Sequence, residues 1–312
     1  MIGTIEREGR EQARSERALD LREGWRTFRV ASWLGWQIES NWADPFVFLS
    51  FTILRPLCTA LVLLLMYRIV GGGNSSPQFF AYLYISNAFF VLVIQTMAGM
   101  SWSIFDDREH YKMLKYIYTS PARQFPYLTG RAVAKIGVAL LTAIILLLVG
   151  VFFLGLHLSI GQIQWGWAIV YFFLGMIILC SLGIVLAGIA LVVARHGASI
   201  GEVTAGMLLL FSGAYFPPDI LPPVLKQITM AMPITYWLEG LRRALNGGIL
   251  TTTYPGGKSG PISPLLAQFN DWQLLLIVLV SALVSAVVSY LFFRWVEHQA
   301  KERGMIDRLT GY

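Results

Sequence analysis

Long apolar runs, separated by short polar segments, make up most of the chain between residues 46 and 295. Each run is close to the ~20 residues that an α-helix needs to cross the hydrocarbon layer of a membrane. This pattern predicts an all-α membrane protein with six transmembrane helices. The six runs cover residues 46–70, 79–104, 128–154, 165–193, 199–216 and 272–295.

The first 44 residues have a different character. Residues 1–24 alternate glutamate and arginine, which predicts a solvated helix or a disordered tail. In residues 25–44, Trp25, Trp33 and Trp36 mix with arginines. Tryptophan prefers the headgroup zone of a membrane, and arginine can extend toward phosphates. We therefore expect residues 25–44 to form an amphipathic helix that lies in the membrane interface.

A proline-rich apolar segment follows the fifth run, at residues 211–248. Its prolines divide it into pieces that are too short to span a membrane. Broken helices at membrane depth are tolerated where protein covers them or where they line a cavity. The segment predicts re-entrant helices at residues 214–248, dipping back from the outer face, and an external loop at 249–271. The prolines are Pro217, Pro218, Pro222, Pro223 and Pro233.

The composition supports a membrane location for most of the chain. Hydrophobic residues make up 56% and charged residues 13%, against about 25% charged in soluble domains. Lysine and arginine are frequent in residues 105–135 and in the tail at 298–312, whereas residues 71–77 have none. The positive-inside rule accounts for this asymmetry without a nucleic-acid partner. We expect a transmembrane domain at residues 45–297 in the cell membrane, with both termini in the cytoplasm.

The densest charged segment in the body of the chain is FDDREHYKMLKYIYTSP, residues 105–121. One interpretation is a metal site at Asp106, Asp107 and His110 in a membrane-embedded enzyme. The favoured interpretation is a short amphipathic helix in which Asp106 caps the first turn and Glu109 completes a capping box. Its apolar stripe would then press onto lipid or enter a partner protein. Composition does not decide between these two surfaces.

Three polar residues stand within the first two apolar runs. Arg55 faces a bundle interior or a water-filled path, or it extends to the inner headgroups. Asn87 and Gln95 favour hydrogen bonds between helices over ligand contacts. All three remain candidates for a substrate path. Gly256-Gly257-Lys258-Ser259 lacks the leading glycine of a phosphate-binding loop, so we expect no nucleotide site, no metal and no catalytic residue in this chain.

Two sets of motifs resemble the permease subunits of ATP-binding-cassette exporters of the second permease type. The resemblance covers about residues 25–300 and includes Asp44-Pro45 and Pro56 at the start of the first run. His110-Tyr111-Lys112 stand where the family often has Gly-Thr. The first set is Asp107-Arg108-Glu109, Leu114, Thr119-Ser120-Pro121-Ala122-Arg123 and Gly130-Arg131; the second is Ser212-Gly213, Phe216-Pro217, Leu221-Pro222, Pro233-Ile234-Thr235-Tyr236, Gly240-Leu241-Arg242 and Gly247-Gly248.

The resemblance implies that residues 106–120 form a cytoplasmic coupling helix, which docks on a separate nucleotide-binding ATPase subunit. Two copies of that subunit would carry ATP and Mg, and a second permease, identical or related, would complete the exporter. Leu114→Glu would then uncouple the complex without unfolding it. The implied docking residues are Asp107, Arg108 and Glu109, which fix the orientation, and Tyr111, Leu114, Ile117 and Tyr118, which form the packing face.

The resemblance also implies a path lined by the first, second and fifth runs and gated by the re-entrant helices. The expected substrate is amphipathic and drug-like or lipid-like, and a polysaccharide or glycolipid is the alternative. A metal-dependent membrane enzyme and a passive channel or scaffold are hypotheses of different classes. The implied gate residues are Gly213, Phe216, Pro217, Pro222, Pro233 and Tyr236.

Overall fold

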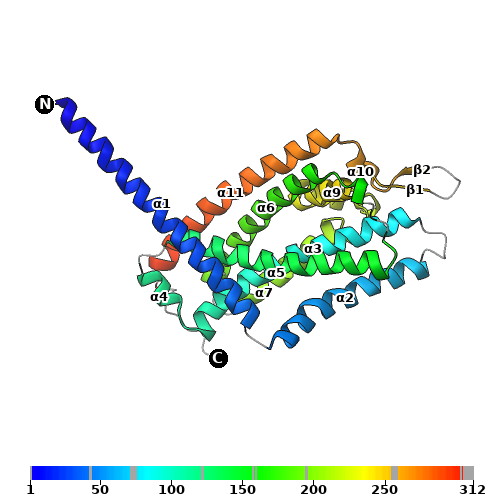
Figure 1. The fold of residues 1–312 in the computed structure, drawn as a ribbon, viewed down its shortest axis with the longest axis horizontal. Helices are drawn as coiled ribbons and strands as arrows, with labels where there is room; N and C mark the ends of the chain where they lie inside the picture. The colour runs from blue at the N-terminus through cyan, green and yellow to red at the C-terminus, as the bar shows by residue number, and fades with distance from the viewer. Residues whose placement is uncertain are drawn as a thin grey trace.

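A computed structural model describes most of the chain, and for some residues, including 2–21 and Arg55, it describes the backbone without the side chain. The chain folds into a bundle of long helices that run between two ends (Figure 1). One end carries α4 (Leu114–Thr119) and the C-terminal end of α11 (Asp271–Glu302), and the other carries a small β-hairpin. The described residues are 2–41, 44–70, 76–120, 123–156, 158, 160–193, 196–253, 259–302 and 304.

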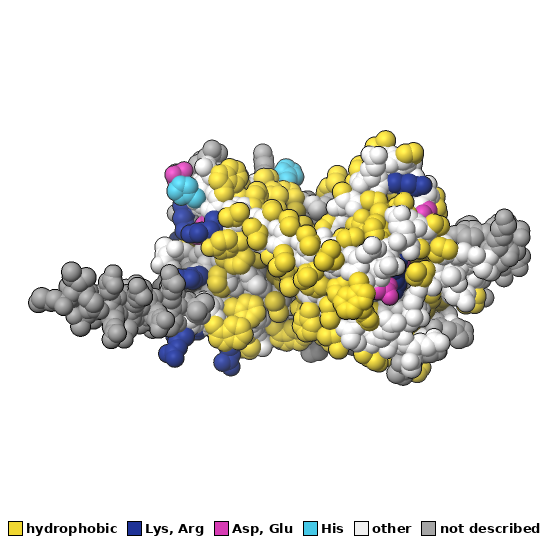
Figure 2. All heavy atoms as spheres, turned by 90° about the horizontal axis from the view of Figure 1, so that it is seen from above, with side chains coloured by type: hydrophobic (Ala, Val, Ile, Leu, Met, Phe, Trp, Pro, Cys, Tyr) yellow, Lys and Arg dark blue, Asp and Glu magenta, His cyan; other side chains and the backbone are white. Residues whose placement is uncertain are grey.

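Four helices of the described chain are long and apolar enough to cross a membrane. They are α3 (Pro77–Phe105) with its extension to His110, α5 (Gln124–Phe153), α6 (Trp165–Val192) and α11. Figure 2 shows hydrophobic side chains over the middle of the molecule, with lysine and arginine near both ends of that band. Two further helices fall in predicted runs: α2 (Pro45–Val70), and α7 (Gly197–Phe211), which at about 22 Å is shorter than the hydrocarbon layer.

The N-terminal helix α1 is continuous from Ile2 to Asn41, so the predicted division after residue 24 is not a break in the helix. Figure 1 shows α1 crossing the bundle obliquely and projecting beyond it. Trp25 and Trp33 are exposed, whereas Ala31 and Gly35 are buried. The amphipathic segment therefore packs its small residues against protein and turns its tryptophans outward. The alternating charged side chains of residues 2–21 lie outside the described side chains.

Small residues let α1 and α5 approach closely, as they do in many membrane helix pairs. A Cβ atom added to Gly130 would lie 2.6 Å from the carbonyl oxygen of Phe28 and 2.8 Å from the Cβ atom of Ala31. Lys135 of α5 also forms an ion pair with Glu39 of α1. The crossing of α1 over α5 thus depends on a glycine at position 130.

We expect Gly130→Ala to loosen α1 from the bundle, because the added methyl group overlaps backbone atoms of α1. Overpacking of this kind costs about 1–3 kcal/mol. The thermal midpoint in detergent should fall, and proteases should cut α1 sooner. Gly206→Ala on α7 is the matched control, since a Cβ atom there meets nothing within 4 Å. Equal thermal midpoints for the two variants would contradict the close packing of α1 on α5.

The central helix α3 has the most buried apolar window of the four candidate spans. It packs against α5, α6 and α7. The main core gathers side chains of α3, α6 and α9 (Pro233–Asn246), and a second core joins α1, α4, α5, α6 and α11 at the α4 end. Because α3 runs from one core into the other, it connects the two regions in which the sequence places functional residues.

The predicted external loop at residues 249–271 contains regular structure. Strands β1 (Thr251–Thr253) and β2 (Ser259–Pro261) pair in antiparallel register, and α10 (Pro264–Ala267) follows them. Asp219, in the short helix η3 (Pro218–Ile220), accepts hydrogen bonds from the Ser263 hydroxyl (2.6 Å) and the Leu265 amide (2.9 Å). These bonds fasten α10 to η3. Residues 254–258, with most of the phosphate-loop-like sequence, lie outside the described residues. The remaining short helices are η2 (Ile160–Gln162) and α8 (Pro223–Ala231).

Candidate functional site

The segment between α3 and α5 is two helical pieces, and the prediction of one helix at residues 106–120 is wrong. Helix α3 continues directly into a π-helical turn, η1 (Asp106–His110), and α4 begins at Leu114. Between them Lys112 takes a left-handed conformation with φ 50°. Asp106 does not cap a helix start, because α3 already supplies the preceding turns and their carbonyl oxygens.

Asp107 and Arg108 point into the protein and fasten η1 to two spans. The Asp107 carboxylate, which is fully buried, accepts a hydrogen bond from the Tyr127 hydroxyl (2.7 Å) and lies 3.5 Å from the Arg131 guanidinium. Arg108 donates a hydrogen bond to the carbonyl oxygen of Leu191 at the end of α6 (2.5 Å). Both side chains therefore act as internal anchors of the segment.

The apolar stripe of α4 also faces the protein. Leu114 is 3% exposed and belongs to the second core, against which Ile117 and Tyr118 pack. Burial and the nearby carboxylate of Glu297 raise the pKa of Tyr118, so its phenol stays neutral. Leu114, which was expected to enter a partner protein, is therefore already covered by its own chain.

The opposite face of α4 and of the turn before it is open. Tyr116 is 65% exposed and Tyr111 is 42% exposed. The Tyr111 ring lies edge-on against His110 (4.9 Å), and the Lys115 ammonium lies 5.2 Å from the Tyr116 ring centroid. The sequence interpretation missed Tyr116, although it follows Lys115 directly and Lys112 at i+4, which places it on the polar side. The exposed residues of this face are His110, Tyr111, Lys112, Lys115, Tyr116, Thr119 and Ser120.

The predicted re-entrant segment forms two short helices near the other end of the bundle. After α7 the chain turns at Gly213, whose φ of 71° favours glycine. Helix α9 is about 21 Å long, which is too short to span a membrane, and most of its side chains are buried. The Tyr236 hydroxyl donates to the carbonyl oxygen of Met230 (2.8 Å), joining α9 to α8. Of the other predicted gate residues, Pro217 is buried, Phe216 and Pro233 are half-buried and Pro222 is exposed.

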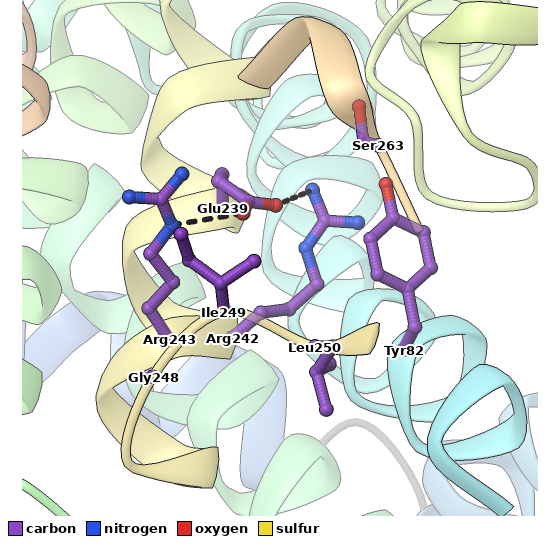
Figure 3. A pocket seen from close by; sticks show the side chains of 8 residues that line it. All are labelled: Tyr82, Glu239, Arg242, Arg243, Gly248, Ile249, Leu250 and Ser263. Carbon is purple, nitrogen blue, oxygen red and sulfur yellow. Dashed lines mark hydrogen bonds and ion pairs between the residues drawn. The ribbon is translucent and has the colours of Figure 1, made fainter. Parts of the chain in front are cut away.

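A buried polar cluster that the sequence interpretation missed holds α9 in place (Figure 3). Glu239 forms ion pairs with Arg242 (3.2 Å) and Arg243 (3.0 Å). Arg243 also pairs with Asp271 at the start of α11 (3.0 Å). The signal was available in the sequence, because a glutamate with arginines three and four residues later is unusual inside an apolar segment.

Arg242 connects the same cluster to α3. Its guanidinium lies 3.9 Å from the Tyr82 ring centroid and donates hydrogen bonds to the Ser86 hydroxyl (3.0 Å) and the Gly213 carbonyl oxygen (3.2 Å). Glu239 and its two arginines therefore join α9 to α3, to α11 and to the turn after α7. This arrangement suits a rigid block at one end of the bundle.

Comparison with known proteins identifies the family. The family model of the ABC-2 type transporter matches residues 28–246, which is more than half of the chain and includes η1, α4 and α9. The chain belongs to the ABC-2 type transporter family. A search of the curated proteins gives no match. The chain is thus a membrane-embedded ABC transporter permease of the second type.

The polar residues that were predicted to line a path through this permease contact their own chain where they are described. Asn87 is 5% exposed and its side chain lies near the Tyr215 hydroxyl. The Gln95 amide donates to the Thr142 hydroxyl (3.4 Å) and so links α3 to α5. The side chain of Arg55 lies outside the described side chains. A role in the path remains a prediction for all three.

The metal-site hypothesis gains no support from the described part of the permease. Within those residues, no group of three histidine, cysteine, aspartate or glutamate side chains is placed to hold a metal ion. Asp107 is instead occupied by Tyr127 and Arg131. His110 is exposed and its ring contacts Tyr111. Asp107 and His110 therefore have other partners in the structure.

Proposed function

We propose that this permease exports an amphipathic, drug-like or lipid-like substrate from the cytoplasm. Two copies of a separate nucleotide-binding subunit would hydrolyse ATP with Mg, and a second permease, identical or related, would complete the transport path. The family match over residues 28–246 is the observation that carries this proposal. In the proposed topology α2, α3, α5, α6, α7 and α11 are the six spans, residues 45–297 form the transmembrane domain, and both termini are cytoplasmic.

The ATPase would dock on the exposed face of α4 and the turn before it. Tyr111 and Tyr116 offer aromatic surface there, with Lys112 and Lys115 beside them. Aromatic residues contribute strongly to protein interfaces because they bury large areas. Of the docking residues that the resemblance implies, Tyr111 remains on this surface. Asp107, Arg108 and Leu114 instead have an internal role.

The internal anchors give a physical route from that surface to the spans. Asp107 ties η1 to α5 through Tyr127 and Arg131, and Arg108 ties it to the end of α6. A movement of α4 caused by the ATPase would therefore be transmitted to α3, α5 and α6 together. The polar cluster of α9 would hold the far end of the bundle while the spans rock, and the re-entrant helices would form the outer gate.

We expect Tyr116→Glu to reduce co-purification of the nucleotide-binding subunit at least tenfold, because it places a charge in the centre of the docking surface. The tagged permease is purified from its native membranes in mild detergent, and co-purifying chains are quantified by mass spectrometry. Val224→Glu, at a 67% exposed position on α8, is the matched control and should leave the complex intact. An ATPase bound equally by wild type and Tyr116→Glu would contradict this docking surface, and no ATPase with either would contradict the proposed function.

The structure changes the expected result for Leu114→Glu. Because Leu114 is 3% exposed in the core of its own chain, a glutamate there places a carboxylate among apolar side chains. We now expect loss of folded permease, measured as loss of the monodisperse peak in size-exclusion chromatography. A Leu114→Glu protein that is folded but no longer binds the ATPase would contradict this expectation and would instead support uncoupling without unfolding.

A further inference from the structure

An open apolar groove of about 410 Å³ lies between α1, α5, α6 and α11. Phe28 of α1 forms one side, and Phe125 and Val133 mark its extent on α5. Ile177 of α6 and Ala286 of α11 line the remaining sides. The contributing segments of α5 and α6 are about 12–16 Å long at 1.5 Å per residue. Since α5, α6 and α11 are candidate spans, the groove faces the hydrocarbon layer.

The groove is built for hydrocarbon. Its lining is mainly phenylalanine, methionine, isoleucine, valine and alanine. The three hydroxyl groups in the lining donate hydrogen bonds to carbonyl oxygens of their own helices. A polar substrate would find few partners here, whereas an acyl chain gains apolar contact along the whole length. The three hydroxyl residues are Thr129, Ser181 and Ser289.

A cation stands beyond the end of the groove that is nearer to α4. Arg294 follows Ala286 and Tyr290 on one face of α11, at a spacing of four residues. Its guanidinium lies 5.5 Å from the Tyr290 ring centroid, and that ring packs edge-on against Phe125 of the groove (5.2 Å). Arg294 is exposed and has no carboxylate partner among the described residues, since the nearby Glu297 pairs with Lys301.

We propose that the groove holds one acyl chain of an anionic phospholipid whose phosphate meets Arg294. The apolar walls select the chain, and the unpaired guanidinium selects the negative headgroup at the depth where the spans reach the interface. The bound lipid contacts both α1 and α11 and therefore stabilises the packing of α1 against the bundle. This site requires the membrane-spanning helices and does not depend on the proposed substrate or ATPase.

The test is native mass spectrometry of the full-length permease in mild detergent, titrated with palmitoyl-oleoyl phosphatidylglycerol or phosphatidylcholine. We expect the wild type to bind one phosphatidylglycerol more tightly than phosphatidylcholine. Arg294→Gln should lower the phosphatidylglycerol affinity roughly fivefold, the effect of one basic residue near an anionic surface. It should lower the phosphatidylcholine affinity less, because the choline cation offsets the charge of that lipid's phosphate. Lys226→Gln on α8 removes the same charge away from the groove and should change neither affinity.

Groove filling tests the acyl-chain part separately. Ala286→Trp and Ile177→Trp place an indole in the groove from two different helices, α11 and α6, and should lower binding of both lipids. Val287→Trp, at a 57% exposed position on α11 outside the lining, is the control. Equal lipid binding by wild type, Arg294→Gln and both groove-filling variants would overturn the proposal. Two groove variants guard against misfolding of one, and circular dichroism checks that each is helical.

Discussion

Glu239→Gln is expected to leave little folded permease in the membrane. Glu239 is 5% exposed and faces two buried arginines at 3.0 and 3.2 Å. Glutamine keeps the shape of the side chain but removes the charge, so Arg242 loses its ion pair and Arg243 keeps that with Asp271. Breaking a buried ion pair from one side costs about 3–5 kcal/mol. That is a large part of the 5–15 kcal/mol by which folded domains are typically stable.

Thermal unfolding in detergent, together with the yield of monodisperse protein, measures this effect. Glu202→Gln is the matched control, since that carboxylate is exposed and accepts one hydrogen bond from Trp102. The double variant Glu239→Gln with Arg242→Gln should recover part of the lost stability, because it removes one of the uncompensated charges. An unchanged thermal midpoint in Glu239→Gln would show that α9 does not depend on the polar cluster.

Asp107→Asn is expected to release η1 and α4 from the bundle. The substitution keeps an acceptor for Tyr127 but removes the negative charge 3.5 Å from the buried Arg131 guanidinium. No nitrogen atom of that guanidinium has a hydrogen-bond partner in the described part of the chain, so the carboxylate is its main compensation. We expect a cost of about 3–5 kcal/mol, concentrated in residues 104–120.

Hydrogen exchange followed by mass spectrometry localises this change. Amides of residues 104–120 should exchange faster in Asp107→Asn, while those of α9 should be unaffected. Asp106→Asn is the control for charge and sequence position, because Asp106 is half-buried and the described structure shows no ion pair for it. The same comparison tests the enzyme hypothesis: a metal-dependent enzyme would lose its activity with Asp106→Asn, whereas an exporter should retain transport. Equal exchange in both variants would contradict the anchoring role of Asp107.

Hydrophobic runs located the long helices well where their ends coincide with a change from apolar to polar residues. The predicted run at 165–193 corresponds to α6 (Trp165–Val192), and the run at 46–70 to α2 (Pro45–Val70). The ends differ where a helix continues through polar sequence. Helix α11 extends to Glu302, because Glu297 and Lys301 support its last turns through a pair at i, i+4.

The direction in which α4 faces was beyond sequence reasoning. The stripe of Leu114, Ile117 and Tyr118 is equally suited to a partner protein and to the chain's own core. Contacts with residues distant in sequence decide it, such as Tyr118 with Lys301 of α11. Likewise the resemblance implied an orienting role for Asp107 toward a partner, whereas its own partners, Tyr127 and Arg131, lie 20 or more residues away in the sequence. The ion pairs of Glu239, in contrast, could be predicted from the sequence, because the arginines follow it at i+3 and i+4.

Site-specific photo-crosslinking can show whether the open face of α4 contacts an ATPase subunit. A photoreactive phenylalanine analogue replaces Tyr116 in the full-length permease, which is irradiated in its native membranes. We expect a crosslink to a nucleotide-binding subunit from position 116 and none from position 272, where Trp272 is exposed at the start of α11. Crosslinks from position 116 to lipid alone, or equal ATPase crosslinks from both positions, would contradict it.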